Sequence, residues 1–222
     1  ERKITLFHSN VVSSFTKNED IIIDLIGFHG QTILHNPKNK YSKQLGNGNL
    51  LSQLSKKKVI YNFRQNDLLK GGEGAPLSPI FHQIIVKEKK IDLPVCILNI
   101  GGISNLTLIK DLKEENLISK DIGPGNCLID EWIRRNKKGN YDKNGEFARQ
   151  GKTNKLILDQ ALDDFENILS NNINSYDVND FEINFLRGLD LEDGASTITD
   201  FTSNIIASKL LATISKHNQK IS

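Results

Sequence analysis

The clearest pattern along the chain is a pair of apolar runs separated by a glycine-containing turn. Residues 95–98 and 106–109 are apolar, and the polar segment 99–105 between them contains two adjacent glycines. Short apolar runs around a tight turn are typical of two paired strands. A polar connection follows, and then a Gly-Pro-Gly turn precedes apolar residues with helical spacing, for which we expect Asn126 to be the cap.

Strand patterns and helix patterns alternate in the rest of the chain. The apolar, β-branched run at residues 21–26 predicts a strand, and residues 42–45 and 59–63 are expected to form further short strands. Apolar positions three and four residues apart predict helices at residues 49–54, 79–86, 144–150, 155–169 and 195–214. The glycine-rich residues 71–76 are expected to be irregular, and Gly194 suits the start of the last helix. This alternation predicts the α/β fold class.

A charged stretch divides the pattern into two parts. Residues 87–92 have the composition of a linker, and the strand pair starts a new sheet after it. We therefore predict two domains, residues 1–92 and residues 93–222. The chain has 222 residues, of which 37% are hydrophobic, and this length suffices for one large domain or two small ones.

The composition argues against several classes of partner. The 29 basic and 27 acidic residues give a net charge of +2, so no overall field favours nucleic acid or an anionic membrane. No apolar run approaches the roughly 20 residues that span a bilayer. Cys96 and Cys127 have no further Cys or His near them. This favours reduced thiols in the cytoplasm and argues against a metal site.

Polar clusters at the ends of predicted strands are candidates for binding a ligand, because ligands of open α/β sheets bind beyond the carboxyl ends of the strands. Arg64 offers a two-pronged fork to a carboxylate. The simpler alternatives are a histidine that only caps its strand end and a structural ion pair between Arg64 and Asp67. The candidates for a polar, sugar-like ligand are His29, Gly30, Gln31, Thr32, Arg64 and Asp67.

Asp121 is the candidate catalytic residue, because it lies between two glycine turns whose bare amides suit phosphate oxygens. Its carboxylate either accepts a proton as a general base or holds Mg²⁺ through water, and the residues alone leave both roles open. Ordinary turns remain the simpler interpretation of both glycine segments. The candidates for binding phosphate or nucleotide are Asn99, Gly101, Gly102, Ser104, Asn105, Gly123, Gly125 and Asn126.

Six motifs in a fixed order carry a resemblance that is more specific than any glycine turn. They are GFHGQTILH (27–35), YNFRQND (61–67), GGEGAPLSP (71–79), NIGGISNLT (99–107), DIGPGNCLIDEW (121–132) and YDKNGEFARQG (141–151). Their order and spacing resemble the anhydro-N-acetylmuramic acid kinase family. The resemblance runs over most of the chain.

The resemblance implies an actin-like, ribonuclease H-like ATPase fold, with two domains around a cleft, as in sugar kinases and heat-shock ATPases. It implies a cytoplasmic, homodimeric enzyme that uses ATP and Mg²⁺ to open and phosphorylate 1,6-anhydro-N-acetylmuramic acid. The product would be N-acetylmuramic acid 6-phosphate, in bacterial cell-wall recycling. By this analogy Asp121 is the base that activates water, and residues 99–105 form the second phosphate loop. His29 to Thr32, Arg64 and Asp67 would face the sugar.

The chain departs from the family pattern in three places. The first phosphate loop would precede Glu1, and the adenosine-binding glycines would follow Ser222. Together with the absence of methionine, this predicts an internal fragment that binds ATP poorly and is inactive alone. Residues 174–181 replace the usual Lys-Ser-Thr-Gly-Arg pattern, so we carry over no contact from them. The alternatives are a non-catalytic sugar-binding remnant or a different sugar kinase of the superfamily.

Overall fold

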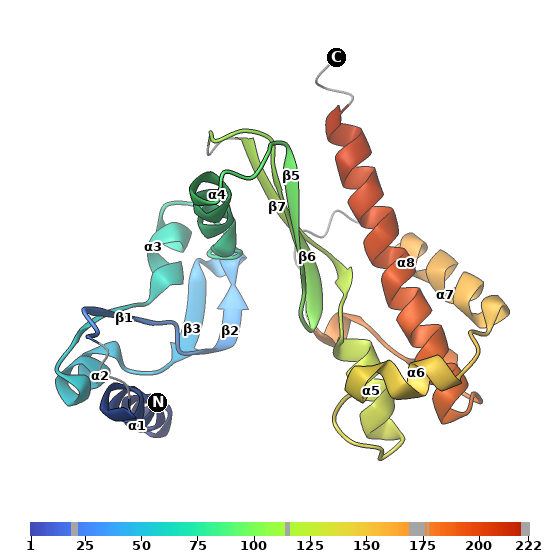
Figure 1. Cartoon of the computed structure of the whole chain (residues 1–222), viewed down its shortest axis with the longest axis horizontal. Helices are drawn as coiled ribbons and strands as arrows, with labels where there is room; N and C mark the ends of the chain where they lie inside the picture. The colour runs from blue at the N-terminus through green and yellow to red at the C-terminus, as the bar shows by residue number, and fades with distance from the viewer. Residues whose placement is uncertain (19–21, 114–115, 169–175, 177, 219–222) are drawn as a thin grey trace. The chain divides into compact units, whose positions relative to one another are not determined.

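The computed structural model describes residues 1–18, 22–113, 116–168, 176 and 178–218, and it divides into two compact units. The units are Glu1–Leu77 and Ser78–Ser222, each described by itself below (Figure 1). This division lies earlier than the predicted boundary at residue 92, because helix α4 (Ser78–Glu88) packs on the sheet of the second unit. The correspondence of the two units to the domains of a larger fold stays a prediction.

The described residues of the first unit form two small sheets and three α-helices. Strands β1 (Leu25–Phe28) and β4 (Lys58–Tyr61) pair in parallel, and β2 (Gln31–Asn36) pairs antiparallel with β3 (Tyr41–Leu45) across the short helix η1 (Pro37–Asn39). The helices are α1 (Arg2–Asn18), α2 (Gly48–Ser55) and α3 (Phe63–Leu69). Phe28, Leu51 and Leu68 are buried between these elements.

The predicted elements of the first unit are largely confirmed. Strand β3 and helix α2 lie where the pattern predicts them, and residues 71–76 are irregular. The strand predicted at residues 59–63 ends at Tyr61 instead, because Asn62 adopts the left-handed conformation (φ 60°, ψ 44°) and helix α3 starts after it. Strand β1 starts at Leu25, later than predicted. Residues 21, 169, 175 and 177, which belong to predicted segments, lie outside the described residues.

The sheet of the second unit has three antiparallel strands in the order β5-β6-β7. They are β5 (Val95–Ile100), β6 (Ile103–Ile109) and β7 (Leu117–Pro124). The predicted polar connection before Asp121 is wrong over this last strand. Ile118 and Ile122 are four residues apart there, and both pack on one face of the sheet. Asp121 therefore lies within a strand.

The two faces of this sheet are covered by different helices. Leu106, Leu108 and Ile122 pack against Ile206 of helix α8 (Leu191–Asn218). Thr107, which alternates with these leucines, faces the other way and contacts helix α4, where its hydroxyl lies 2.9 Å from His82 Nδ1. Burial lowers the pKa of His82. The long helix α8 and the shorter α4 thus lie on opposite faces (Figure 1).

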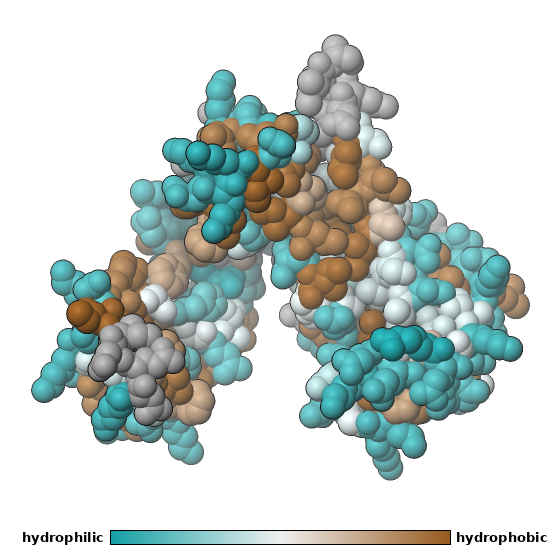
Figure 2. All heavy atoms as spheres, in the orientation of Figure 1, coloured by the Kyte–Doolittle hydropathy of each residue, from teal (hydrophilic) through white to brown (hydrophobic). Residues whose placement is uncertain are grey.

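The remaining helices of the second unit surround the main core. Leu128, Ile133, Leu186 and Ile198 are fully buried there. The visible surface over α5 and α6 is mostly hydrophilic, whereas hydrophobic residues gather over the three-stranded sheet (Figure 2). The elements are α5 (Cys127–Arg135), η3 (Lys143–Gly145), α6 (Glu146–Gln150), α7 (Lys155–Ile168), η4 (Val178–Asp180) and η5 (Asn184–Leu186).

Helix α8 begins earlier than its sequence pattern indicates. The carboxylate of Asp190 accepts a hydrogen bond from the amide of Asp193 at 2.8 Å and so caps the helix before Leu191. Gly194 therefore lies inside the first turns, where a Cβ would collide with the ring of Trp132. In the described ranges, no helix combines the length and apolar character needed to cross a membrane.

Candidate functional site

Three polar side chains lie in one row across the three-stranded sheet. Asn99 of β5 pairs with Asn105 of β6, and Asn105 pairs with Asp121 of β7. Directly paired residues project from the same face of a sheet. This row therefore lies on the face opposite α8. The predicted catalytic carboxylate and two of the predicted phosphate ligands are brought together.

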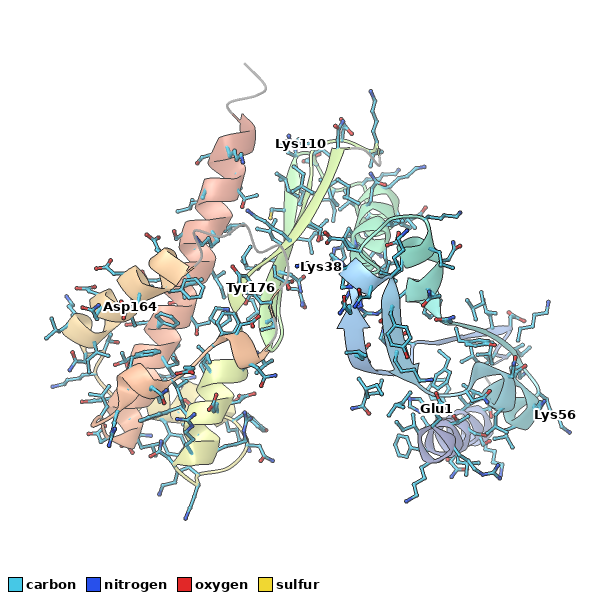
Figure 3. All side chains as sticks on the ribbon, turned by 180° about the vertical axis from the view of Figure 1, so that it is seen from behind. Glu1, Lys38, Lys56, Lys110, Asp164 and Tyr176 are labelled. Carbon is cyan, nitrogen blue, oxygen red and sulfur yellow. The ribbon has the colours of Figure 1, made fainter. Side chains whose placement is uncertain are left out.

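The carboxylate of Asp121 has a main-chain donor far away in the sequence. The amide of Tyr176 donates a hydrogen bond to Asp121 Oδ2 at 2.9 Å. Figure 3 shows Tyr176 beside the sheet, near the edge strand β7. Burial is the main cause that raises the pKa of the Tyr176 hydroxyl, and the negative charges of Asp121 and Asp180 raise it further. Asp121 is half-buried.

The first glycine turn has room around its glycines. A Cβ at Gly102 would lie 4.0 Å from its nearest neighbour, Cys127 Cβ, and a Cβ at Gly101 would make only ordinary contacts, the closest at 3.6 Å. Neither glycine has a positive φ angle. Nothing among the described residues therefore requires glycine at these two positions. An external group that approaches the backbone closely would require it.

The second glycine turn is packed against the first. The amides of Gly125 and Asn126 donate to the carbonyls of Gly102 and Gly101, at 2.8 and 2.7 Å. A Cβ at Gly125 would collide with the Gly101 carbonyl, and one at Gly123 would lie 2.6 Å from Ile205 Cγ2. These amides already have partners, so a phosphate could use them only by displacing the first turn. A phosphate role for the three residues of this turn stays a prediction.

Two predicted residues of these turns have local partners in the structure. Asn126 is the residue before α5, but its side chain makes no capping bond, because its backbone is already helical (φ −79°, ψ −12°). Its Nδ2 instead donates to the Ile100 carbonyl at 3.5 Å. Ser104 is fully buried, and its hydroxyl donates to the Pro124 carbonyl at 3.1 Å. Ser104 thus links β6 to β7.

In the first unit, His29 and Arg64 meet where the two parallel strands end. His29 follows β1, Arg64 lies in the first turn of α3 just after β4, and both Nε and Nη2 of Arg64 lie 3.3 Å from His29 Nε2. Because a guanidinium only donates, Nε2 is the acceptor, and the Nδ1 hydrogen bonds the Gly30 carbonyl at 2.9 Å. Burial lowers the pKa of Arg64. Among the described residues, Arg64 forms no ion pair with Asp67.

The other predicted sugar-facing residues are not all in this contact. Gln31 is exposed at the start of β2, and Thr32 Oγ1 accepts a hydrogen bond from Gln44 Nε2 at 3.3 Å. Asp67 accepts a hydrogen bond from the Gly74 amide at 2.7 Å, and a Cβ at Gly72 would collide with its carboxylate. Asp67 therefore holds the glycine-rich loop 71–76 in place.

A cavity of about 310 Å³ in the first unit includes His29 and Gly30 in its wall. The sequence reasoning missed the other polar side chains there. Tyr41 and Lys43 are two residues apart on β3, and this alternation is the signal that would have placed both on one face. The missed polar lining residues are Glu1, Tyr41, Ser42, Lys43, Gln44, Tyr61 and Asn62.

A second cavity, of about 410 Å³, lies beside the glycine turns in the second unit. Asn126, Asp130 and Tyr141 line it, together with Asp142. The Asp142 carboxylate accepts hydrogen bonds from the Phe147 and Ala148 amides, both at 3.0 Å, and so caps α6. Burial raises the pKa of Asp130. Two of the six motifs thus meet at one surface.

Comparison with known proteins decides which family this arrangement belongs to. The sequence profile of anhydro-N-acetylmuramic acid kinase matches residues 1–219. The chain belongs to this family. Members of the anhydro-N-acetylmuramic acid kinase family are sugar kinases of the actin-like ATPase superfamily, and the mixed α/β structure agrees with the fold class predicted from the sequence.

Curated anhydro-N-acetylmuramic acid kinases match nearly the whole chain. The protein of Pelagibacter ubique (strain HTCC1062) is 52% identical over 222 residues, which are 100% of this chain and 59% of the relative. That of Zymomonas mobilis (strain ATCC 31821 / ZM4 / CP4) is 38% identical over 95% of this chain and 57% of its own length. That of Brucella canis (strain ATCC 23365) is 38% identical over 89% and 54%. The chain thus spans somewhat more than half the length of these relatives.

Proposed function

We propose that the complete protein to which this chain belongs opens the anhydro bond of 1,6-anhydro-N-acetylmuramic acid and phosphorylates the sugar with ATP. The product is N-acetylmuramic acid 6-phosphate, and the process is cell-wall recycling. The observation that carries the proposal is the row of Asn99, Asn105 and Asp121 beside a glycine turn that has room for an external group. The names of the relatives support the choice of substrate.

The turn at Gly101 and Gly102 is the part of the chain that fits a phosphate. A side chain at either position would occupy the space in front of the backbone, and no described residue fills that space. Backbone amides in such a turn favour anions, and ATP supplies the phosphoryl group. Mg²⁺ would come bound to the ATP phosphates and would neutralise part of their charge, and the predicted site residues include no metal ligand. In the described ranges, no group of three or more His, Cys, Asp or Glu side chains is placed to hold a metal ion.

Asp121 acts as the general base. Its carboxylate takes a proton from water, the water oxygen bonds to C1 of the sugar, and the bond between C1 and O6 breaks. O6 then receives the γ-phosphoryl group, and ADP leaves. The protein mainly has to hold these groups in line, as is usual for phosphoryl transfer. The fixed position of the Asp121 side chain on the sheet suits this role.

Arg64 is the candidate for binding the carboxylate of the lactyl ether group of the sugar. Its guanidinium is half-buried, and its contacts at 3.3 Å are to the neutral His29 ring. A partly desolvated guanidinium gains most from a bidentate carboxylate partner. His29 and the cavity beside it provide further polar contacts for the sugar. Gly30, Gln31, Thr32 and Asp67 remain part of this predicted surface.

Location and assembly are part of the same proposal. The Cys96 and Cys127 thiols are both unpaired, and burial raises the pKa of each. Thiols held in the protonated form are poorly reactive, which suits a cytoplasmic enzyme. We further propose a homodimer that acts on a small sugar and not on nucleic acid or membranes.

The test is an ADP-release assay on the complete protein with 1,6-anhydro-N-acetylmuramic acid. We expect turnover in the wild type and a loss of about 10²-fold or more in Asp121→Asn, because the amide cannot accept the proton. Sugar binding, measured by calorimetry, should stay within a few-fold. Asp163→Asn, an exposed carboxylate change on α7, is the matched control and should keep full activity.

Three results would count against the proposal. Turnover that survives in Asp121→Asn would exclude Asp121 as the base. Turnover of glucose or glycerol, without turnover of the anhydro sugar, would favour a different sugar kinase. A complete protein that binds the anhydro sugar and releases no ADP would favour the non-catalytic remnant.

A further inference from the structure

We propose that the backbone amide of Tyr176 positions the Asp121 carboxylate for proton transfer. This inference rests on the proposed function, because it assigns a role within the same reaction. The bond joins residues far apart in the sequence, and its donor is the main chain. Tyr176 is therefore a positioning residue that acts through Asp121.

The place of Asp121 shows what such a donor contributes. Asp121 lies on the edge strand of the sheet and is half-buried, and the strand pairing fixes its backbone but does not set the orientation of its carboxylate. A hydrogen bond from a backbone amide to an ionised carboxylate is among the stronger protein hydrogen bonds. At 2.9 Å it restrains the carboxylate in one orientation. A base that is held in one orientation avoids losing conformational freedom when the substrate arrives.

The donor is itself anchored by aromatic packing. The Tyr176 ring lies 5.4 Å from the Phe181 ring, centroid to centroid, and the Phe181 ring stacks at 6.1 Å on that of Phe165. Phe165 is buried, and a Cβ at Gly123 would lie 3.5 Å from its Cζ. Gly123 is two residues after Asp121 on β7. The strand that carries the base and the segment that holds it therefore share one hydrophobic cluster.

A purely structural role is the alternative that has to be distinguished. In that case the carboxylate would only attach the Tyr176 segment to the sheet, and loss of the bond would change stability without changing proton transfer. A positioning bond to the charged form of a base has a further consequence. Its loss makes the charged form less favourable, so the acid limb of the pH–rate profile moves to higher pH.

The test removes only the donor atom. In the complete protein, Tyr176 is replaced by its α-hydroxy acid analogue, which turns the amide into an ester and keeps the side chain. We expect kcat with the anhydro sugar to fall about tenfold or more, which corresponds to one hydrogen bond to a charged group. The KM for ATP should stay within about twofold, and the acid limb should move upward. Asp163→Asn, an exposed carboxylate change on α7, is the control and should retain kcat within about twofold.

An ester variant with unchanged kcat and an unchanged pH profile would overturn the proposal. So would an ester variant that is less stable but has the wild-type profile, because this is the structural role. A Tyr176→Phe variant as slow as the ester would also overturn it, because the hydroxyl would then be the active group.

A second measurement needs no turnover. The chain has four tyrosines, so selective ¹⁵N-tyrosine labelling of the complete protein gives few amide signals to assign. The Tyr176 amide should shift with pH as the carboxylate titrates, and Asp121→Asn should abolish that shift. An amide that does not titrate would overturn the positioning bond, whatever the activity. An amide that titrates in a protein without turnover of the anhydro sugar would overturn the proposed function and confirm the bond.

Discussion

A methyl group added at Gly125 would collide with the carbonyl of Gly101, whereas one added at Gly102 would meet nothing closer than 4.0 Å. The two turns look alike in the sequence, since each has two glycines close together, Gly101 and Gly102 in the first and Gly123 and Gly125 in the second. In the structure, the second turn uses its amides to hold the first, and the first keeps space in front of its backbone. A glycine needed for packing and a glycine needed for a ligand are thus distinguished by what surrounds them.

The largest effect is expected for Gly125→Ala. The new methyl group has to displace the Gly101 carbonyl, and overpacking of this kind costs about 1–3 kcal/mol. Because the shift also moves the first turn, we expect turnover to fall together with stability. Urea unfolding and the ADP-release assay on the complete protein measure both. A variant that is as stable as the wild type would contradict the packing role.

Gly102→Ala is the matched change in the first turn, and its effect should separate the two properties. The backbone there has no positive φ, so the free energy of unfolding should stay within about 1 kcal/mol of the wild type. The KM for ATP should rise about tenfold or more, because the methyl group occupies the space assigned to phosphate. Unchanged ATP kinetics would remove the main reason for calling this turn a phosphate site.

The smallest effect is expected for Ser104→Ala. The Ser104 hydroxyl is fully buried and donates to the Pro124 carbonyl, so its loss should cost about 1 kcal/mol of stability. Turnover should stay within a few-fold, because this hydroxyl holds the strands together and does not face the proposed phosphate. Ser203→Ala, on the exposed side of α8, serves as the control for removing a hydroxyl. A variant in which only the KM for ATP rises would instead indicate that the Ser104 hydroxyl binds phosphate.

The sequence predicted those parts of the site that depend on local patterns. Strands β5 and β6 follow from their apolar runs, and the meeting of His29 and Arg64 follows from the rule that ligand sites lie at the ends of parallel strands. Strand β7 was missed because three consecutive polar residues, 119–121, separate Ile118 from Ile122, and such a run resembles a polar connection. The family resemblance supplied the substrate, which no local pattern contains.

Contacts between residues far apart in the sequence could not be predicted from local sequence patterns. The amide of Asn126 bonds a carbonyl of the first turn, and only the folded arrangement shows that its donor is already used. The bond from Tyr176 to Asp121 has a main-chain donor, which every residue except proline possesses, so no residue type marks it. The local role of Asp67 depends likewise on the path of the glycine-rich loop.

The irregular pairing between β6 and β7 determines which face of the sheet carries Asp121. Ser104 pairs with Gly123, but the next residue of β6, Asn105, pairs with Asp121, so β7 has one extra residue at Ile122. Ile122 and Gly123 consequently both pack toward α8, where Ile206 and Ile205 receive them. Without the extra residue the alternation would run on unbroken, and Asp121 would point into the hydrophobic core. One extra residue in β7 thus places the Asp121 carboxylate on the face where a substrate can reach it. Without that residue, the carboxylate would be buried among isoleucines.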